Sequence, residues 1–376
     1  MPKRILFSGY APVHVLCFMP AYRLLRDNPE VELWLSGGFQ TKTEDGETFS
    51  LEGFYDAFDV DRDRIITVEQ SRQEDFDVVV CSHLSTNLFP RSATKAVEVF
   101  HGVSFKNLMA RGTKALDYDL LCVPGNYHAA LFQSNGLIQP EGGTQGYVTG
   151  FTKLDAFFSG ELDRDETLRK VGVDPAMPTL LYTPTGGKKN SLEIMGEEVI
   201  GLLGQQEGWN LLIKPHDHPK KKIDWFARLA PYESDRVKLV RDWDVVPYLF
   251  AADLLISDAS STTVEYTLLD RPIIFLDVPA LLGKIVKRGG FLDLDTYGRK
   301  IGTRVAAPEE VVACVEDALA HPERESELRM AMAKDVFHDP GHAAERVKEV
   351  ILFAAGVTAS LPESIRQLEP AAPASV

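Results

Sequence analysis

The stretch DLLISDASSTTVEYTLLDRPIIFLD, residues 253–277, decides the fold class of this chain. The apolar run from Asp253 to Ile256 is typical of a parallel strand that is covered on both faces, and the polar segment after it predicts a turn and then a helix. Arg271-Pro272 ends the helical pattern, and a second apolar run begins at Ile273. The order strand, helix, strand predicts two parallel strands joined by a crossover helix.

The turn within this stretch, SDASS, places small hydroxyl side chains at the carboxyl end of a strand and the amino end of a helix. Backbone N–H groups at a helix start lack intrahelical partners, so the turn can bind a phosphate, and we expect Asp258, Ser260 and Ser261 to contribute. Thr262 and Glu265 leave a structural alternative open, because their spacing also fits a capping box. Glu265 has a second candidate role, which is to accept hydrogen bonds from a ribose.

Similar apolar runs alternate with helical patterns along the rest of the chain. A strand at residues 4–9 precedes a helix from about His14 to Asp27. Other runs typical of buried strands begin at Val31, Val78, Val97, Leu120, Tyr147, Thr179, Asn210 and Val237. This alternation predicts an α/β fold with two Rossmann-like parallel-sheet domains, whose strand ends face a ligand-binding cleft.

We place the domain boundary near residue 155, where the sequence becomes polar, charged and proline-bearing. Residues 1–155 then form an N-terminal Rossmann-like domain and residues 156–340 a C-terminal, nucleotide-binding one. A helix at residues 341–357 is expected to pack back toward the N-terminal domain. Residues 358–376 are rich in Pro, Ala and Ser, which predicts a flexible tail. The polar, acidic segment 41–73 has too weak a periodicity for an assignment.

Composition excludes several classes of protein. With 376 residues, 44% hydrophobic and 25% charged, the chain can form two sizeable globular cores. The formal net charge of -15 argues against a nucleic-acid-binding protein, since such domains carry a basic excess. The 4 cysteines lie apart, in or beside apolar runs, which indicates buried thiols in a reducing cytoplasm. No apolar run has the length of a signal peptide or membrane helix, so we expect a cytoplasmic protein and leave peripheral membrane contact open.

Further polar residues follow predicted strands. They are His101 and Gly102 with Lys106, then Thr185 and Lys188 in the loop TPTGGKK, and then Lys214 and His216. A neutral histidine at a strand end can take a proton at neutral pH, so His101 is our candidate general base. A lone histidine is more often a structural hydrogen-bonding residue, and that alternative stays open.

Lys214 and His216 flank a proline that forces an extended backbone, and a cation and an imidazole there suit a diphosphate. Solvated loop charge is the alternative. His14 is a second candidate beside His101, although its place at the start of an apolar helix favours a packing role.

The sequence offers no persuasive metal site. Asp242 and Asp244 have the spacing of an Asp-x-Asp metal motif, but they precede a predicted helix, where Asp244 is a natural N-cap. There is no Walker lysine motif and no G-x-G-x-x-G, so ATP hydrolysis and NAD-dependent redox chemistry lose their usual support. We therefore expect neither a metal nor an organic cofactor.

Together these motifs resemble the CDP-glycerol glycerophosphotransferase family, enzymes of the GT-B fold that build polymers of the teichoic-acid type. The matching segments are FHGVSFKN (100–107), YVTGFTKLD (147–155), LLYTPT (180–185), IKPH (213–216), the stretch 253–277 and DPGHAAERV (339–347). The resemblance implies that His101 is the catalytic base and that His216 contacts the donor phosphate. It also implies that Ser260 and Ser261 hold the pyrophosphate.

The sequence departs from the family pattern at three places, one of which is a pair of residues. Gly186 replaces the usual aromatic residue after Pro-Thr, Ala259 replaces the tyrosine of Asp-Tyr-Ser-Ser, and Glu265-Tyr266 replaces a Phe-Asp pair. An acidic residue at position 265 is more similar to nucleotide-sugar enzymes of the same fold, including UDP-N-acetylglucosamine 2-epimerases. The donor is therefore less well defined than the fold.

The resemblance implies a metal-independent transferase that moves glycerol phosphate, or a related alcohol phosphate, from a CDP-activated donor to an acceptor hydroxyl in cell-surface polymer or glycan synthesis. The donor would bind the C-terminal domain. The residues expected around it are Thr185, Lys188, Lys214, His216, Asp258, Ser260, Ser261, Thr262 and Glu265. A glycan or lipid-linked acceptor would bind the N-terminal domain near His14, His101, Gly102 and Lys106.

Two alternatives stay open, namely a GT-B glycosyltransferase or 2-epimerase-like enzyme, and a non-catalytic nucleotide-binding protein. The chain lacks the extra basic, membrane-seeking helices of some polymerising members, which favours single addition over processive synthesis. Residues Ala280 to Phe291 mix cationic with apolar side chains and are the candidate for contact with a lipid-linked acceptor.

Overall fold

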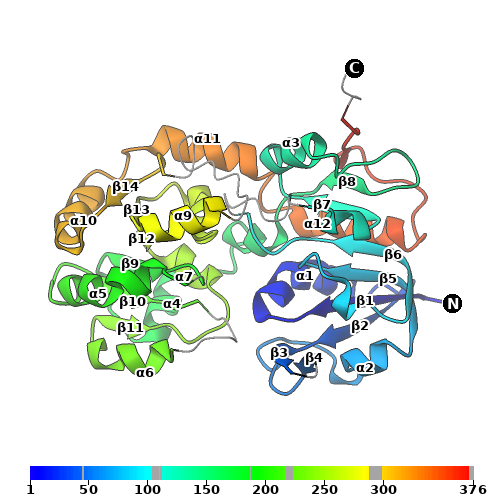
Figure 1. The fold of residues 1–376 in the computed structure, drawn as a ribbon, viewed down its shortest axis with the longest axis horizontal. Coiled ribbons are helices and arrows are strands. Elements are labelled where there is room, and N and C mark those ends of the chain that lie inside the picture. The colour runs from blue at the N-terminus through cyan, green and yellow to red at the C-terminus, as the bar shows by residue number, and fades with distance from the viewer. Residues whose placement is uncertain are drawn as a thin grey trace. The chain divides into compact units, whose positions relative to one another are not determined.

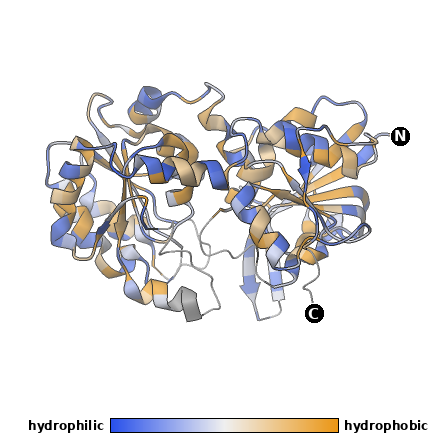
Figure 2. Ribbon diagram, turned by 90° about the horizontal axis from the view of Figure 1, so that it is seen from above, coloured by the Kyte–Doolittle hydropathy of each residue, from blue (hydrophilic) through white to orange (hydrophobic). Residues whose placement is uncertain are grey.

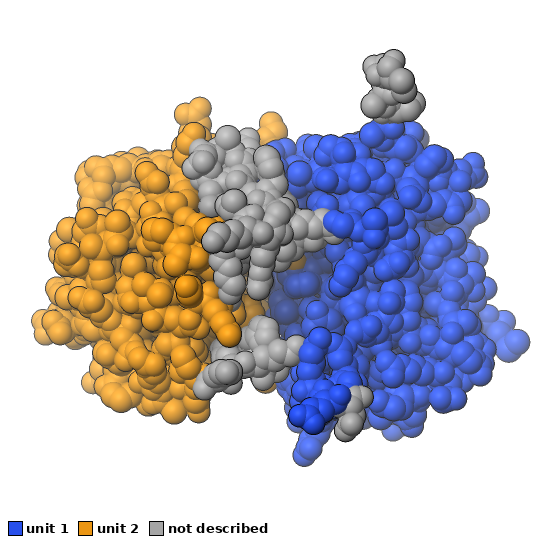
Figure 3. All heavy atoms as spheres, in the orientation of Figure 1, with its two compact units in different colours: residues 1–101, 109–158, 335–376 blue, residues 102–108, 159–334 orange. Residues whose placement is uncertain are grey.

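The computed structural model (Figure 1) describes residues 1–44, 46–103, 110, 112–186, 188–216, 223–287 and 299–371, without the side chains of 284–287. The chain divides into two compact units, which Figure 3 colours separately. Unit 1 consists of Met1–His101, Met109–Phe158 and Asp335–Val376, and unit 2 of Gly102–Leu108 and Ser159–Lys334. Each unit is a parallel sheet with helices, so the predicted α/β class is confirmed.

Unit 1 is built on a seven-stranded sheet in the order β15-β8-β7-β6-β5-β1-β2. Its strands are β1 (Lys3–Gly9), β2 (Val31–Gly37), β5 (Asp75–Cys81), β6 (Ser92–Glu98), β7 (Leu120–Val123), β8 (Gln145–Val148) and β15 (Arg366–Gln367). All neighbouring strands pair in parallel except β15, which is antiparallel to β8. A separate hairpin joins β3 (Phe39–Thr43) and β4 (Gly46–Ser50).

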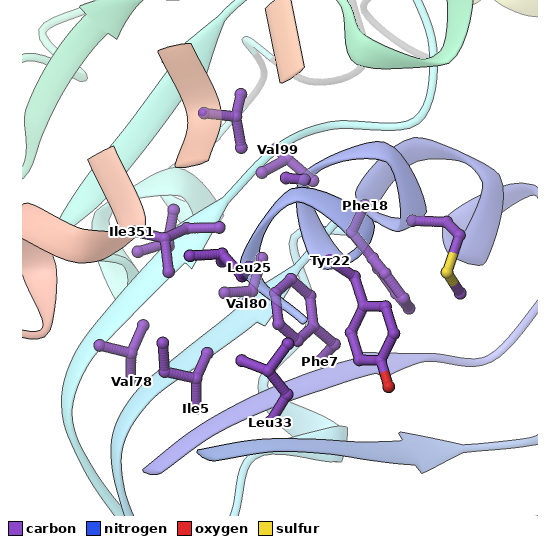
Figure 4. Packing of buried hydrophobic residues seen from close by; sticks show 14 of the residues in the cluster. Ile5, Phe7, Phe18, Tyr22, Leu25, Leu33, Val78, Val80, Val99 and Ile351 are labelled. Atoms are coloured by element: carbon purple, nitrogen blue, oxygen red, sulfur yellow. The ribbon is translucent and has the colours of Figure 1, made fainter. Parts of the chain in front are cut away.

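Helices cover the sheet of unit 1. They are α1 (Pro12–Leu25), α2 (Val68–Ser71), α3 (Asn126–Ser134) and α12 (Ala343–Ala354), with the 3-10 turns η1 (Arg62–Arg64), η2 (Thr86–Leu88), η4 (Lys114–Asp117) and η5 (Thr152–Phe157). Figure 4 shows Phe7 of β1 packed among Phe18 and Tyr22 of α1, with Ile351 of α12 in the same cluster. Leu6 belongs to a second cluster, because successive side chains of a strand point to opposite faces. Burial on both faces explains the uninterrupted apolar run of β1.

Unit 2 is built on a six-stranded sheet in the order β11-β10-β9-β12-β13-β14. Its strands are β9 (Thr179–Thr183), β10 (Asn210–Ile213), β11 (Val237–Leu239), β12 (Leu254–Ser257), β13 (Ile273–Leu276) and β14 (Thr303–Val305), and neighbouring strands pair in parallel. Figure 2 shows mostly hydrophobic strands and helices of mixed hydropathy. The pairing of Leu255 with Ile273 confirms the strand, helix, strand prediction for residues 253–277.

The helices of unit 2 include one irregular segment. They are α4 (Arg164–Val171), α5 (Glu197–Gly204), α6 (Trp225–Leu229), α7 (Val246–Ala251), α8 (Thr262–Glu265), α9 (Pro279–Lys287), α10 (Val311–Ala320) and α11 (Ser326–Val336), with 3-10 turns η7 (Ala230–Tyr232), η8 (Tyr266–Leu269) and η10 (Pro308–Glu310). The π-helical turn η6 (Leu192–Gly196) runs directly into α5. Among the described residues no helix is both long and apolar enough to cross a membrane.

Several elements differ from the sequence predictions. The tail expected to be flexible contains β15, and Leu368 is buried with 2% exposure, because an apolar side chain in this polar segment reaches the core. The strand predicted to begin at Val97 starts earlier, at Ser92, and ends at Glu98, since Phe100 adopts a left-handed backbone with φ 54. The unassigned segment 41–73 includes part of the β3–β4 hairpin, and β14 was not predicted.

Candidate active site

In unit 1, three histidines and a tyrosine come together at the carboxyl ends of β1, β5 and β6, which are neighbours in the sheet. The ring centroid of His14 lies 4.6 Å from that of His101 and 5.1 Å from that of His83. Tyr10 lies 4.3 Å from His14 and 4.8 Å from His83. We call these four residues the histidine cluster. The sequence predicted His14 and His101 but missed His83 and Tyr10, which follow strand ends just as they do.

His101 is the exposed member of the histidine cluster. Its Nδ1 atom forms a hydrogen bond with the backbone carbonyl oxygen of Ser82. Because a carbonyl oxygen only accepts, Nδ1 carries the hydrogen, and the neutral ring holds its lone pair on Nε2. A nitrogen fixed in this tautomer is suited to accept a proton from a hydroxyl group.

His14 and His83 are buried, with 2% and 6% exposure. Burial, with a smaller contribution from the neighbouring His101, lowers the pKa of His14 well below its usual value and lowers that of His83 to about 3. Both rings are therefore neutral in the folded protein at neutral pH. The Nδ1 atom of His14 accepts a hydrogen bond of 3.2 Å from the backbone N–H of Tyr10.

Gly102 and Lys106 are the other two residues predicted on the acceptor side. Gly102 is partly exposed and follows His101 directly. Lys106 lies outside the described residues. The segment predicted to contact a lipid-linked acceptor, 280–291, is described only as far as the end of α9 at Lys287.

In unit 2, the predicted donor-binding residues follow β9, β10 and β12, and β9 lies between the other two strands. Thr185 follows β9, Lys214 follows β10, and Asp258 follows β12. The topology therefore brings three of the polar groups found in the sequence to one edge of the sheet. The side-chain oxygens of Thr183 and Thr262 lie 2.8 Å apart and link β9 to α8 directly.

Asp258 is buried and its carboxylate bonds to the loop after β9. Oδ1 accepts a hydrogen bond from the backbone N–H of Thr185 at 2.9 Å, and Oδ2 accepts from the N–H and the hydroxyl of Ser191 at 2.9 and 2.8 Å. These bonds give Asp258 a structural role at the site. Its predicted contact with a donor stays a prediction.

The capping box considered for Thr262 and Glu265 is not formed. Ser261 occupies the N-cap position of α8 and makes no capping hydrogen bond through its side chain, while Thr262 bonds to Thr183 instead. Ser260 is buried, and its hydroxyl accepts from the N–H of Thr262 at 3.4 Å. Glu265 is fully buried, which places it inside unit 2 and away from solvent.

Lys214 is buried with 6% exposure, whereas His216 and Lys188 are exposed. The backbone N–H of Lys214 donates a hydrogen bond of 2.9 Å to the carbonyl oxygen of Tyr182, which extends the pairing of β10 with β9 by one residue. The ring of His216 lies against Gly186, so that a Cβ atom at position 186 would stand 2.7 Å from its Nδ1. The departure from the family pattern at Gly186 therefore leaves space for His216.

Two segments that carried the family resemblance bind each other within unit 1. The carboxylate of Asp155 accepts hydrogen bonds from the N–H groups of Gly341, Ala343 and Ala344 at 3.1, 3.1 and 2.7 Å. Arg346 donates to the carbonyl oxygen of Thr149 at 2.7 Å. Segments YVTGFTKLD and DPGHAAERV thus hold α12 against the end of β8, which is a structural task.

No group of three or more His, Cys, Asp or Glu side chains within the described ranges is arranged to hold a metal ion. Asp244 accepts a hydrogen bond of 2.8 Å from the N–H of Val246, but the N-cap of α7 is Val245, one residue later than predicted. Asp242 accepts a hydrogen bond from the hydroxyl of Tyr248.

A family model described as CDP-Glycerol:Poly(glycerophosphate) glycerophosphotransferase matches residues 76–353. The chain belongs to this family. The matched range contains His101, His216 and the whole stretch 253–277, so the resemblance found in the sequence is confirmed. The roles of individual residues in the family's chemistry stay predictions.

Known relatives of the family are similar to this chain. The teichoic acid glycerol-phosphate primase of Bacillus subtilis (strain 168) is 34% identical over 100 residues, which are 26% of this chain and 24% of that protein. The matched segment therefore spans about a quarter of this curated relative. The wall teichoic acid polymerase TagF has a similar structure, with a TM-score of 0.69 and 17% identity over 95% of this chain and 90% of its own.

A UDP-N-acetylglucosamine 2-epimerase also has a similar structure, with a TM-score of 0.58, 18% identity and coverage of 96% of this chain and 98% of its own. Similarity at this level of identity establishes the fold alone, and it confirms the predicted GT-B fold. The predicted arrangement of the two domains about a cleft stays a prediction.

Proposed function

We propose that this chain transfers glycerol phosphate, or a related alcohol phosphate, from a CDP-activated donor to an acceptor hydroxyl in the synthesis of a polymer of the teichoic-acid type. Membership of the glycerophosphotransferase family supports this reaction. The observation that carries the proposal is the hydrogen bond from Nδ1 of His101 to Ser82, which favours an unprotonated Nε2.

In the proposed reaction, the acceptor oxygen attacks the phosphorus atom that bears the glycerol. A new P–O bond forms, the bond from this phosphorus atom to the oxygen that bridges the diphosphate breaks, and CMP leaves with that oxygen and the electron pair. Nε2 of His101 takes the proton of the acceptor hydroxyl, and a general base of this kind contributes about 10² to 10⁴-fold in rate. The products are the extended acceptor and CMP.

The donor diphosphate would be held at the carboxyl ends of β9, β10 and β12. Lys214 and His216 supply cationic or hydrogen-bonding groups, and Ser260 and Ser261 supply hydroxyl and backbone donors that stabilise charge on the leaving nucleotide. Thr185, Thr262 and Lys188 complete the polar surroundings. Asp258 fixes the geometry of these turns through its hydrogen bonds.

The informative experiment is product analysis with CDP-glycerol, CDP-ribitol and a set of UDP-sugars, each with a glycerol-phosphate-primed acceptor. Release of CMP from CDP-glycerol with extension of the acceptor is the expected result. Formation of UDP without any CMP would overturn the proposal. Assays with and without EDTA test metal independence, because a metal-dependent transferase would lose its activity when the ion is removed.

His101→Asn tests the base. We expect kcat to fall by about 10² to 10⁴-fold, while binding of CDP-glycerol, which involves unit 2, is unchanged. His321→Ala is the matched control, because His321 is exposed in unit 2 and belongs to neither set of proposed site residues. Full activity of His101→Asn would show that another group, or no protein group, accepts the proton.

A second candidate function is that of a nucleotide-sugar enzyme. The acidic residue Glu265 favours it, because it replaces the family's Phe-Asp pattern at α8. In this case Glu265→Gln would reduce turnover of a UDP-sugar, and an epimerase would convert the free nucleotide sugar with no acceptor present. The same donor panel distinguishes the two functions.

We further propose that the protein works in the cytoplasm, at the inner face of the membrane, where it would meet a lipid-linked acceptor. One glycerol phosphate, or one related alcohol phosphate, is added to the acceptor in each encounter. Chain-length analysis of the product from a defined primer tests this, since a processive enzyme would give long products while most of the primer is still unused.

A further inference from the structure

We propose that Glu98 is a positioning residue for His101, because one buried carboxylate holds the two turns that carry His83 and His101. This inference rests on the proposed function of His101 as the catalytic base. Glu98 is the last residue of β6 and is fully buried, with 0% exposure. It does not belong to any segment assigned a chemical role above.

Each oxygen of the Glu98 carboxylate accepts a backbone hydrogen bond from a different turn. Oε1 accepts from the N–H of Phe100 and Oε2 from the N–H of Leu84, both at 3.1 Å. Phe100 immediately precedes His101, and Leu84 immediately follows His83. The carboxylate therefore connects the turn after β6 with the turn after β5.

Both donors have an unusual backbone conformation. Phe100 has φ 54 and Leu84 has φ 45, in the left-handed region that residues with large side chains rarely adopt. Such conformations persist where the surrounding structure fixes them, and they gather at functional sites. The two bonds to Glu98 supply that restraint at the two residues that direct the histidines.

The same turns are also bonded to each other through His101. Nδ1 of His101 bonds to the carbonyl of Ser82, the residue before His83, and the rings of His14 and His101 are in contact. The ring of Phe100 is stacked on Phe132 at 5.3 Å, so its side chain cannot swing outward. Loss of the carboxylate would thus release the peptide units that set the direction of the His101 ring.

A carboxylate is a costly choice at this position. Burial raises the pKa of Glu98 to about 7, although the backbone N–H groups of Leu84, His83 and Phe100 and the side chain of Tyr118 act in the opposite direction. An apolar side chain would avoid the cost of burying charge, but it would leave both N–H groups without this acceptor. The residue fits a position where two acceptors are needed at once.

The test compares Glu98→Leu, which removes both acceptors, with Glu98→Gln, which keeps one. We expect kcat to fall by about 10²-fold in the leucine variant, with an unchanged KM for CDP-glycerol and an intermediate kcat for the glutamine variant. Nitrogen NMR of the histidine rings should show His101 divided between both tautomers in Glu98→Leu. Wild-type kcat together with a wild-type His101 tautomer in that variant would overturn the proposal.

The matched control is Asp155→Leu, which removes a carboxylate that bonds to backbone N–H groups elsewhere in unit 1. It should lower stability without changing the His101 signals or the kcat of the folded fraction. If Glu98→Leu does not fold, the His101 signals and kcat of Glu98→Gln test the proposal instead. A wild-type tautomer together with a wild-type kcat in Glu98→Gln would contradict the proposal that Glu98 positions His101. The NMR measurement needs no substrate, so it tests Glu98 even if the wild-type protein transfers nothing.

Discussion

Asp258 and Ser191 are joined by two hydrogen bonds to one oxygen. Oδ2 of Asp258 accepts from the backbone N–H of Ser191 at 2.9 Å and from its hydroxyl at 2.8 Å. The hydroxyl of Ser191 also lies 2.8 Å from that of Tyr182 on β9. The turn after β12 and the start of the helix that follows the β9 loop therefore act as one structural piece, on which the proposed donor site depends.

Asp258→Asn should lower the free energy of unfolding by about 1 to 3 kcal/mol, because the amide group that replaces one oxygen cannot accept a hydrogen bond from a buried N–H. It should also weaken donor binding, since the loop that carries Thr185 loses its attachment. Urea denaturation and titration with CDP-glycerol measure the two effects. Asp235→Asn, an exposed position in unit 2, should change neither.

Gly186→Ala should weaken the donor complex. The added Cβ atom would stand 2.7 Å from Nδ1 of His216, so the imidazole has to move away from its place. If His216 donates a hydrogen bond to a charged phosphate, its displacement costs about 1.5 to 3 kcal/mol of binding free energy, which is roughly 10 to 100-fold in affinity. Binding of CDP-glycerol to the variant measures this loss.

A double-mutant cycle provides the control for position 186. In the background His216→Ala, the change Gly186→Ala should have little further effect, because the ring that it displaces is gone. Equal losses in both backgrounds would mean that position 186 acts through its own backbone instead.

The fold could be predicted because most strands are covered on both faces. Leu254 to Ile256 and Ile273 to Leu276 are buried, and such strands give apolar runs that need no alternation to be found. The short β14 carries Arg304, and β15 is only Arg366–Gln367, so neither has a hydrophobic run. Their places depend on pairing with β13 and β8, which local sequence does not encode.

The candidate site could be predicted only in part. Hydroxyl, lysine and histidine side chains at strand ends were visible as breaks after apolar runs, and topology brought them to common sheet edges. Glu98 was not visible, because it lies inside the run VEVF and looks like an isolated polar residue of a strand. Its role depends on two bonds to left-handed residues, which only the folded backbone reveals.

Glu98 should make the protein less stable as pH rises. Its folded pKa is raised from 4.5 to about 7, so the stability that it contributes is fully present below pH 4.5 and is lost as pH rises through about 7. The difference corresponds to at most about 3 kcal/mol of unfolding free energy. Charged and titratable neighbours that set this pKa or respond to it are Tyr10, Cys81, His83, Tyr118 and Cys122.

The measurement is urea denaturation of the wild type and Glu98→Gln at pH 5 and pH 8. The buried histidines act in the opposite direction, because the depressed pKa of His83, about 3, makes its contribution fall as pH drops below 6.5. Both proteins contain these histidines, so the difference between their unfolding free energies reports on Glu98 alone. Compared with the wild type, Glu98→Gln should be more stable at pH 8 than it is at pH 5. An equal difference at both pH values would mean that Glu98 titrates normally.

Asp155→Ala should destabilise unit 1 without affecting the donor site. The carboxylate accepts hydrogen bonds from the N–H groups of Gly341, Ala343 and Ala344 at the start of α12. The loss of such a helix cap lowers the free energy of unfolding by about 1 to 2 kcal/mol. Hydrogen exchange should show faster opening of α12, whose buried residues include Val350 and Ile351, with β9 and β12 unchanged. Binding of CDP-glycerol should stay at the wild-type level, because all the proposed donor contacts belong to unit 2. Weakened donor binding in this variant would mean that segment YVTGFTKLD contributes to the site and not only to the fold.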